Sequence, residues 1–444
     1  MRIPVILAAL ALLPTTGYSL GFRLFDQDAF ATARGEAFTA TADNPSAVFF
    51  NPAGITQLDS FTAEISGYGL NFPVYVKDSE GNEYRSNNNL HALGQVYLTA
   101  KIPNTPVTLG LGSYSPWGLS IDYPDDTTFR NLSVKGSITF ETVNPVVAVQ
   151  LTRSLSVAVG LTLNYAQSML QEGVSMVGDN YKFTGSGEAI GFNAGLMWQP
   201  DEHNSIGLRY QAATPITFSG HSRFSLSSAE KHAIADGNKQ IHAANEAIKE
   251  IKAAYGAYGT AVVDSILTSH GLPTQEIAEL QSNYPQEDAD AKIMFPEFVT
   301  LGYSFRPTKD WNLEADVDWT NWDSLGVVTQ HNQDGSKVEL PFNYNSSFVY
   351  SFGITRYFKY GLHLSGGYIY SQATVPTQYY SPAVPDGRRH IFSVGVGQDL
   401  GNYTWDLAYQ FTYAPTRTID NGTAADGSYQ FSSHALSLSI GLHF

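Results

Sequence analysis

Few residues of this chain stand in patterns that could do covalent chemistry. Nucleophilic hydrolysis requires a serine or cysteine beside a histidine that a third side chain orients. The chain has no cysteine and 11 histidines, and no motif joins one of these histidines to a serine. We therefore expect no enzyme, and we assign no catalytic residue, no cofactor and no metal site.

Charged side chains offer a second kind of chemistry, the recognition of an ionised ligand. Arg209, Glu314 and Asp316 each fall on the more polar face of a predicted strand. A buried charge is costly unless it is paired. Arg209 therefore either holds a ligand carboxylate or pairs with Glu314 or Asp316, and we favour the internal pairing.

The elements that must position these residues are short alternating strands. Large apolar residues alternate with small or polar ones at 155–165, 311–319, 403–413 and 434–444, which is the period of a strand with two unlike faces. Charged residues make up only 15% of the chain, aromatic residues make up 13%, and there are 39 glycines. Such a chain is typical of a β-barrel or a β-sandwich.

The connections between these strands favour the barrel. Six short turns alternate with seven long segments, which gives 14 strands with both chain ends on the short-turn side. Short periplasmic turns and long external loops are typical of outer-membrane barrels. We expect an all-β fold, a 14-stranded antiparallel transmembrane β-barrel over residues 59–444, with apolar faces toward lipid and both termini periplasmic. A soluble sandwich that buries those faces between two sheets is the alternative.

The two ends of the chain agree with export to a membrane. Residues 1–19 have a basic start, an apolar core and small residues before a cleavage position, which predicts a secretory signal peptide and a mature chain that begins at Leu20. The apolar strand that ends at Phe444 resembles the signal read by the barrel-assembly machinery of the outer membrane. The net charge of −16 argues against nucleic acid as a partner.

One long connection, about 222–291, is predicted to be external and partly helical. Ser227 to Glu230 fits a capping box, and apolar residues follow near helical spacing. They form either a cap that packs on its neighbours or an external surface that catches a hydrophobic ligand. The residues of that capture surface are Ile248, Ile251, Tyr255, Val262, Val263, Ile266 and Leu267.

Residues 20–58 precede the first strand and include the nearly uncharged stretch "ADNPSAVFFNPAGIT". A disordered tail would carry more charge and fewer aromatic residues. Because a 14-stranded barrel is too wide for side chains alone to fill, we expect this segment to form a hatch inside the lumen. Its backbone groups can pair there with inward polar side chains. The expected hatch and pocket residues are Leu20, Phe22, Phe25, Phe49, Phe50, Asn51, Pro52 and Ala53.

The run "LGFRLFDQDAFATARGEAFTATADNPSAVFFNPAGIT" resembles the hatch of the FadL family, outer-membrane transporters of long-chain fatty acids and hydrocarbons. It includes the Asn-Pro-Ala motif of that family at 51–53. Further matches cover the mature chain: "SPWGLSIDYPDD" (115–126), "NPVVAVQL" (144–151), "FPEFVTLGYSFRP" (295–307), "WTNW" (319–322) and "AVPDGRRHIFSVG" (383–395). Their order and spacing make the resemblance specific.

The resemblance implies passive uptake of hydrophobic small molecules across the Gram-negative outer membrane, whose lipopolysaccharide blocks simple entry. External loops catch the ligand, an apolar pocket receives it, and a shift of the hatch lets it leave sideways at a kinked third strand. We expect a monomer surrounded by outer-membrane lipid and lipopolysaccharide. Proline lacks a ladder donor and glycine tolerates a bend, so the residues that fit the kink are Gly110, Gly112, Pro116, Trp117 and Gly118. A simple bulge at the strand end is the alternative.

Long-chain fatty acids are the ligand that we favour. Fatty acid transporters of the family carry basic side chains on the upper fifth strand, whereas the corresponding stretch "YAQSMLQEG" (165–173) has none. Aromatic or aliphatic hydrocarbons therefore stay an alternative. A general porin or an adhesin is the alternative of another class, and a porin would lack a hydrophobic plug and conduct ions.

Overall fold

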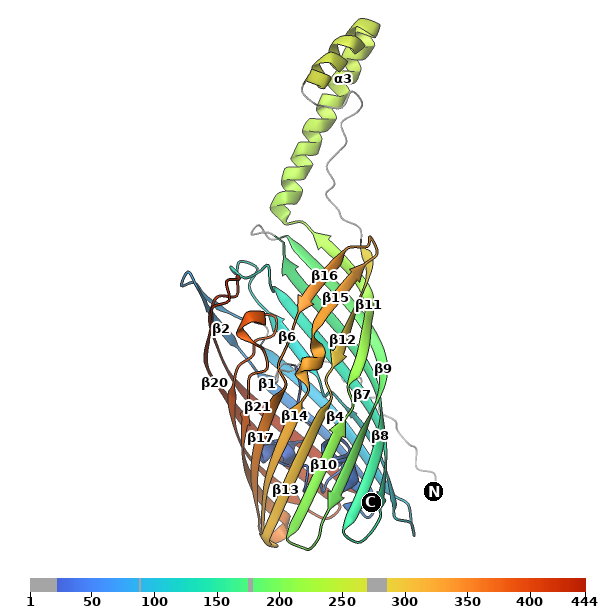
Figure 1. Ribbon diagram of the computed structural model, residues 1–444, viewed down its shortest axis with the longest axis vertical. Helices are drawn as coiled ribbons and strands as arrows, with labels where there is room; N and C mark the ends of the chain where they lie inside the picture. The colour runs from blue at the N-terminus through green and yellow to red at the C-terminus, as the bar shows by residue number, and fades with distance from the viewer. Residues whose placement is uncertain (1–21, 88, 175–178, 270–285) are drawn as a thin grey trace.

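The computed structural model describes residues 22–87, 89–174, 179–269 and 286–444, apart from the side chains of residues 255, 258, 259, 262 and 269. Its strands form one antiparallel sheet that closes on itself. Closure occurs at β1 (Phe61–Asn71), which pairs with β4 (Leu90–Lys101) on one side and with β21 (Gly427–His443) on the other. The predicted 14-stranded antiparallel barrel is confirmed (Figure 1).

Each wall strand consists of one labelled strand or of consecutive labelled strands. Between β4 and β21 the wall strands are β5 (Val107–Tyr114), β7 (Lys135–Gln150), β8 (Leu155–Gly173), β9 (Asn180–Trp198), β10 (Asn204–Gln211) with β11 (Thr214–Ser225), β12 (Glu287–Phe295) with β13 (Phe298–Thr308), β14 (Trp311–Thr320) with β15 (Val327–Asn332), β16 (Lys337–Pro341) with β17 (Ser347–Tyr357), β18 (Leu362–Ser371), β19 (Arg389–Asp399) and β20 (Tyr403–Ile419). Three shorter strands, β2 (Val74–Asp78), β3 (Glu83–Arg85) and β6 (Gly118–Asp122), extend the wall at the rim of the long connections.

The side chains of each wall strand alternate between lipid and lumen. On β8, Val159 is 57% and Leu161 is 46% exposed, whereas Thr162 is fully buried. The outward face is apolar, and exposed aromatic residues such as Trp198 and Tyr403 lie near the short-turn rim, as expected for a wall that meets lipid. The apolar residues therefore face the membrane rather than a second sheet.

The helices are short, with one exception. The segment before β1 contains α1 (Ala29–Ala33), α2 (Ala47–Phe50) and the 3₁₀ helix η1 (Pro52–Gln57), and three further 3₁₀ turns lie in connections: η2 (Trp322–Leu325), η3 (Lys359–Gly361) and η4 (Thr377–Tyr379). The long helix α3 (Ser228–Ser269) projects away from the barrel at the rim of the long connections (Figure 1). None of the described helices is long and apolar enough to cross a membrane.

Candidate functional site: the luminal hatch and the third strand

Residues 22–58, called the hatch below, lie inside the barrel toward the short-turn rim (dark blue in Figure 1). Their apolar side chains form a cluster with inward residues of the wall. The ring of Phe49 lies 4.9 Å from that of Phe50 and 5.0 Å from that of Tyr114 on β5. Phe49 and Phe50 are thus buried inside the lumen, where inward side chains of the wall cover them.

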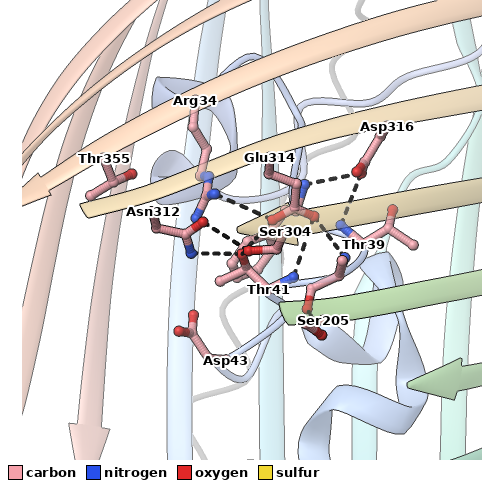
Figure 2. A network of polar contacts seen from close by, with 12 residues as sticks. Arg34, Thr39, Thr41, Asp43, Ser205, Ser304, Asn312, Glu314, Asp316 and Thr355 are labelled. Atoms are coloured by element: carbon pink, nitrogen blue, oxygen red, sulfur yellow. Dashed lines mark hydrogen bonds and ion pairs between the residues drawn. The ribbon is translucent and has the colours of Figure 1, made fainter. Parts of the chain in front are cut away.

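A polar network ties the hatch backbone to β14 (Figure 2). Glu314 accepts hydrogen bonds from the amide of Ala40 (2.7 Å) and from the hydroxyl of Thr41, and it pairs with Arg34 (3.3 Å). Asp316 accepts from the amides of Phe38 (3.1 Å) and Thr39 (2.9 Å). These carboxylates supply acceptors that irregular backbone requires when it is buried at membrane depth.

The pairing expected for Arg209 is not formed. Its guanidinium lies 3.9 Å from the ring centre of Phe49 and 4.6 Å from that of Phe298, and its Nε and Nη2 have no acceptor among the described residues. Glu314 pairs with Arg34 instead, and hatch amides occupy Asp316. The reason is that the hatch supplies donors directly to both carboxylates, whereas Arg209 lies two strands away from β14, with β13 between them.

A second buried ion pair was not anticipated from the sequence. Arg23 of the hatch binds Asp318 of β14 with two nitrogen–oxygen contacts, and the one between Nη2 and Oδ2 measures 2.8 Å. Asp318 shares the inward face of its strand with Glu314 and Asp316, so the alternating pattern of the sequence already places this carboxylate in the lumen. The position of Arg23 opposite it was not, because residues 22–28 form no regular element with a readable face.

Asn51 of the Asn-Pro-Ala motif fixes the last turn of the hatch. Its side-chain nitrogen, Nδ2, donates to the carbonyl of Thr39 (2.8 Å) within the hatch and to that of Leu196 (3.0 Å) on β9. Its side-chain oxygen accepts from the amide of Ala53 (3.2 Å), and Pro52 opens the helix η1. One side chain thus caps a helix and joins two hatch segments to the wall.

Glycines of the wall make room for the hatch backbone. A Cβ added at Gly207 on β10 would lie 2.0 Å from the carbonyl oxygen of Thr39, and one at Gly367 on β18 would lie 2.0 Å from the amide nitrogen of Gly35. Real Cβ atoms are essentially never found at such distances. The neighbouring atoms belong to the backbone, so they cannot rotate away as a flexible side chain could. The inward glycines that the alternating pattern predicts therefore contact the hatch and do not leave empty space in the lumen.

The third wall strand breaks between Tyr114 and Gly118. The ladder between β4 and β5 ends at the pair Val96–Ser113, and β6 pairs with β7 alone among the described strands. Instead, the break pairs with the start of the hatch: the carbonyl of Pro116 accepts from the amide of Leu24 (2.9 Å), and Arg23 forms a bridge with Trp117.

The glycines of β5 serve a different purpose from the break itself. A Cβ at Gly110 or Gly112 would lie 2.9 Å from a methyl carbon of Val48 in the hatch. Both residues stay within the regular ladder that joins β5 to β7. They admit the hatch, whereas the loss of pairing begins at residue 115.

Above the hatch the lumen is filled with aromatic side chains. The ring of Phe22 lies 5.8 Å from Trp117, 5.7 Å from Phe295 and 4.9 Å from Trp322. All four residues are buried and belong to the largest apolar cluster of the described chain. This cluster joins the hatch, the broken third strand and the external rim.

One enclosed cavity of about 30 Å³ lies between the hatch and the wall. Its polar groups include Nε of Arg389 and Nε2 of Gln410, which have no acceptor among the described residues. The cavity is far smaller than the few hundred Å³ that bury an organic ligand. Its apolar lining consists of Phe25, Leu70, Phe72, Ile369 and Ile391.

Two hatch carboxyl groups lie near this cavity. Asp26 and Glu36 are both buried, and neither oxygen of Glu36 meets a donor among the described residues. Burial raises the pKa of Glu36 well above its usual range, and the neighbouring Asp26 raises it further. Burial and the neighbouring carboxyl group therefore both favour the protonated form of Glu36.

Comparison with known proteins places the chain. The family model described as outer membrane protein transport protein (OMPP1/FadL/TodX) matches residues 10–444. The chain belongs to this family. The long-chain fatty acid transport protein of Escherichia coli K12 is 21% identical over 483 residues, which cover 98% of this chain and 96% of that protein.

Solved structures share the fold of this FadL-family chain. A FadL homologue of Pseudomonas aeruginosa matches with a TM-score of 0.76 at 17% identity, covering 96% of this chain and all of that one. The toluene transporter TodX of Pseudomonas putida matches with a TM-score of 0.70 at 16% identity, again covering 96% and 100%. The protein is thus an outer-membrane β-barrel of the FadL family.

The external helix α3 occupies 228–269 of the connection predicted to be partly helical, and the ends of strands β11 and β12 reach into its two ends. The capping box is formed: the amide of Ser227 donates to Glu230 (2.9 Å), whose amide donates to the Ser227 hydroxyl (3.1 Å). The helix bends at Gly256, where φ is +53°, and Lys252 meets Asp264 (2.8 Å) across the bend.

The residues expected to form the capture surface differ in burial. Val263 and Leu267 are buried, Ile248 is half-buried, and Ile251 and Ile266 are exposed. The side chains of Tyr255 and Val262, and the whole of Leu20 and the signal segment, lie outside the described residues. Only part of the apolar stripe therefore faces outward.

Proposed function

We propose that this protein carries hydrophobic small molecules, long-chain fatty acids in particular, passively across the outer membrane. Membership of the family supports the transport of hydrophobic compounds, since the Escherichia coli relative is named for long-chain fatty acids and the Pseudomonas putida neighbour for toluene. The observation that carries the proposal is the continuous apolar and aromatic lumen between the external rim and the hatch.

The proposed route begins on the exposed apolar residues Ile251 and Ile266 of α3. It continues through the aromatic cluster to the cavity beside Phe25. Because that cavity holds about 30 Å³, enough for little more than a water molecule, a ligand enters only when the hatch moves. The exit that we propose is the wall between β4 and β6, where the ladder stops at Val96.

A fatty acid fits this route because the cavity offers cationic and amide donors beside apolar walls. Nε of Arg389 and Nε2 of Gln410 are buried without acceptors, and a carboxylate would supply them. A charge-assisted hydrogen bond of this kind is stronger than a neutral one. The acyl chain would then lie along Phe25, Leu70 and Ile369.

Replacing Arg389 with Gln should weaken the binding of a long-chain fatty acid by about 10- to 150-fold, since a hydrogen bond to a charged group contributes about 1.5–3 kcal/mol. Binding of an alkane or alcohol of equal chain length should stay unchanged. Calorimetry on the purified protein measures both. Arg417→Gln is the matched control, because Arg417 also contacts Asp386 but does not line the cavity. Equal losses in the two variants would assign the effect to a loosened external segment.

Hydrocarbons are the second candidate ligand, favoured by the absence of Arg and Lys from 165–173. Mass spectrometry of small molecules that co-purify with the protein from membranes separates the two candidates. Fatty acids in the extract would support the proposal that the protein binds a carboxylate. Neutral aromatic or aliphatic compounds would instead support hydrocarbons as the ligand.

Repair of the third strand should close the proposed exit. Pro116→Val restores a ladder donor and Gly118→Thr favours extended backbone, so the double variant should lose most of its uptake while the barrel still folds. Growth on the ligand and uptake of labelled ligand by cells measure this. Pro145→Val, within the continuous ladder between β7 and β5, controls for the loss of a proline. Full uptake in the repaired variant would rule out this exit.

We also propose that the protein works as a monomer and that the barrel-assembly machinery recognises its last strand. Phe444 is 73% exposed and packs on Phe61, with 5.6 Å between ring centres. An exposed terminal aromatic is available to a receptor before insertion. Removal of Phe444, so that the chain ends at His443, should therefore slow assembly in the membrane.

A further inference from the structure

Four neighbouring strands carry a row of polar, mostly basic side chains on the outer surface of the barrel. Lys135 on β7 is paired with Gln171 on β8, Gln171 with Lys182 on β9, and Lys182 with Arg223 on β11. Directly paired residues point to the same face of a sheet, and the next residue on β9, Phe183, is buried in the lumen. These four residues, called the basic row below, therefore point away from the barrel.

The basic row lies above the lipid-facing belt. On β8, Tyr165 is the last aromatic residue of the outward face, and Gln171 follows six residues later toward the external rim. Six residues of strand span about 20 Å, and a strand tilt of 35–45° converts this to about 15 Å of height. The row therefore lies at the level of the headgroups of the outer leaflet.

Two of the three charges of the basic row, those of Lys182 and Arg223, have no acidic partner among the described residues. Lys182 and Arg223 stand directly opposite each other, and like charges in that position destabilise a sheet. Neither takes part in an ion pair among the described residues, whereas the neighbouring Lys135 binds Asp122 (2.9 Å) and His221 binds Asp288 (2.9 Å). Two adjacent uncompensated cations are notable in a chain with a net charge of −16.

We propose that the basic row binds the phosphorylated saccharide headgroup of a lipopolysaccharide molecule in the outer leaflet. Arginine binds phosphate with two parallel hydrogen bonds, and lysine adds a point charge. Three strand spacings separate Lys135 from Arg223, which is about 14 Å, enough for a headgroup with more than one phosphate. The proposal concerns the outer wall and is independent of what passes through the lumen.

The test uses full-length protein, purified in detergent and stripped of lipid, to which defined lipopolysaccharide is added. Lys182→Gln with Arg223→Gln should weaken its binding by about 10- to 30-fold, on the basis of two basic residues at an anionic surface. Native mass spectrometry and the shift of thermal unfolding with lipopolysaccharide concentration measure the change. The matched control is Lys77→Gln with Lys337→Gln, two exposed lysines on β2 and β16, which removes the same charge and should leave binding unchanged.

Three further results decide the proposal. The exchange variant Lys182→Arg with Arg223→Lys should keep binding, which also separates charge from any folding defect. Lipopolysaccharide without phosphates should bind the wild type as weakly as intact lipopolysaccharide binds the glutamine variant. Equal binding by the glutamine variant and the wild type, or equal competition by phosphatidylglycerol, would overturn the assignment.

Discussion

Gly367→Val should leave the barrel folded and unseat the hatch. The Cβ of residue 367 would lie 2.0 Å from the amide nitrogen of Gly35 and 2.2 Å from the carbonyl carbon of Arg34. Both are backbone atoms, so the clash is relieved only when the hatch moves away from β18. Overpacking costs about 1–3 kcal/mol, which raises the unseated population by about 5- to 150-fold. Single-channel recording in a planar bilayer should show openings that the wild type lacks.

The neighbouring glycine provides the control for this result. Gly366 points to lipid, and a Cβ there would come no closer than 3.9 Å to Ile354 or Ser393. Gly366→Val changes the same strand by the same group and should conduct as little as the wild type. If Gly367→Val is also silent, the hatch does not block the lumen in the way that its contacts indicate. A wild type that conducts ions freely would instead favour the general porin alternative.

The barrel could be predicted from the sequence because its physical basis is local. Alternation fixes which residues face lipid, and the lengths of the connections fix the number and direction of strands. Even the inward face of Glu314 and Asp316 followed from parity alone. Each of these properties depends on residues that are adjacent in the chain.

The partners of those inward residues could not be predicted in the same way. Arg209 and Glu314 share the lumen, but parity gives the face of a residue and not the path of the segment that fills the space. Arg34 reaches Glu314 because α1 ends beside it, and Arg23 reaches Asp318 because the hatch starts at the broken third strand. Irregular backbone has no period from which such contacts can be read.

The external helix illustrates a third case. Its apolar residues recur at helical spacing, which predicted the helix and its capping box. The spacing could not reveal that Gly256 bends the helix and that Lys252 then meets Asp264. Nor could it reveal that Leu267 is buried while Ile266 beside it stays exposed.

Glu314→Leu should release the hatch from β14. The side chain is fully buried and accepts from two hatch amides and the Thr41 hydroxyl while pairing with Arg34 (3.3 Å). Removing one partner of a buried ion pair costs about 3–5 kcal/mol, so opening of the hatch should rise by roughly 150- to 5,000-fold. The chain has no cysteine, so a cysteine placed at the buried Ala37 reports opening through its rate of modification by a thiol reagent.

Asp310→Asn tests whether this result depends on burial or only on the loss of a carboxylate. Asp310 lies at the turn before β14 and pairs with Arg356 at 3.6 Å, where both side chains are partly exposed. Such a pair contributes about 0–1 kcal/mol, so labelling of the reporter cysteine should change by less than about fivefold. Fast labelling in Glu314→Leu alone means that the carboxylates of the wall hold the hatch in place. Slow labelling in both variants means that the apolar contacts of Phe49 and Phe50 hold it, and ligand entry would then have to disrupt those contacts first.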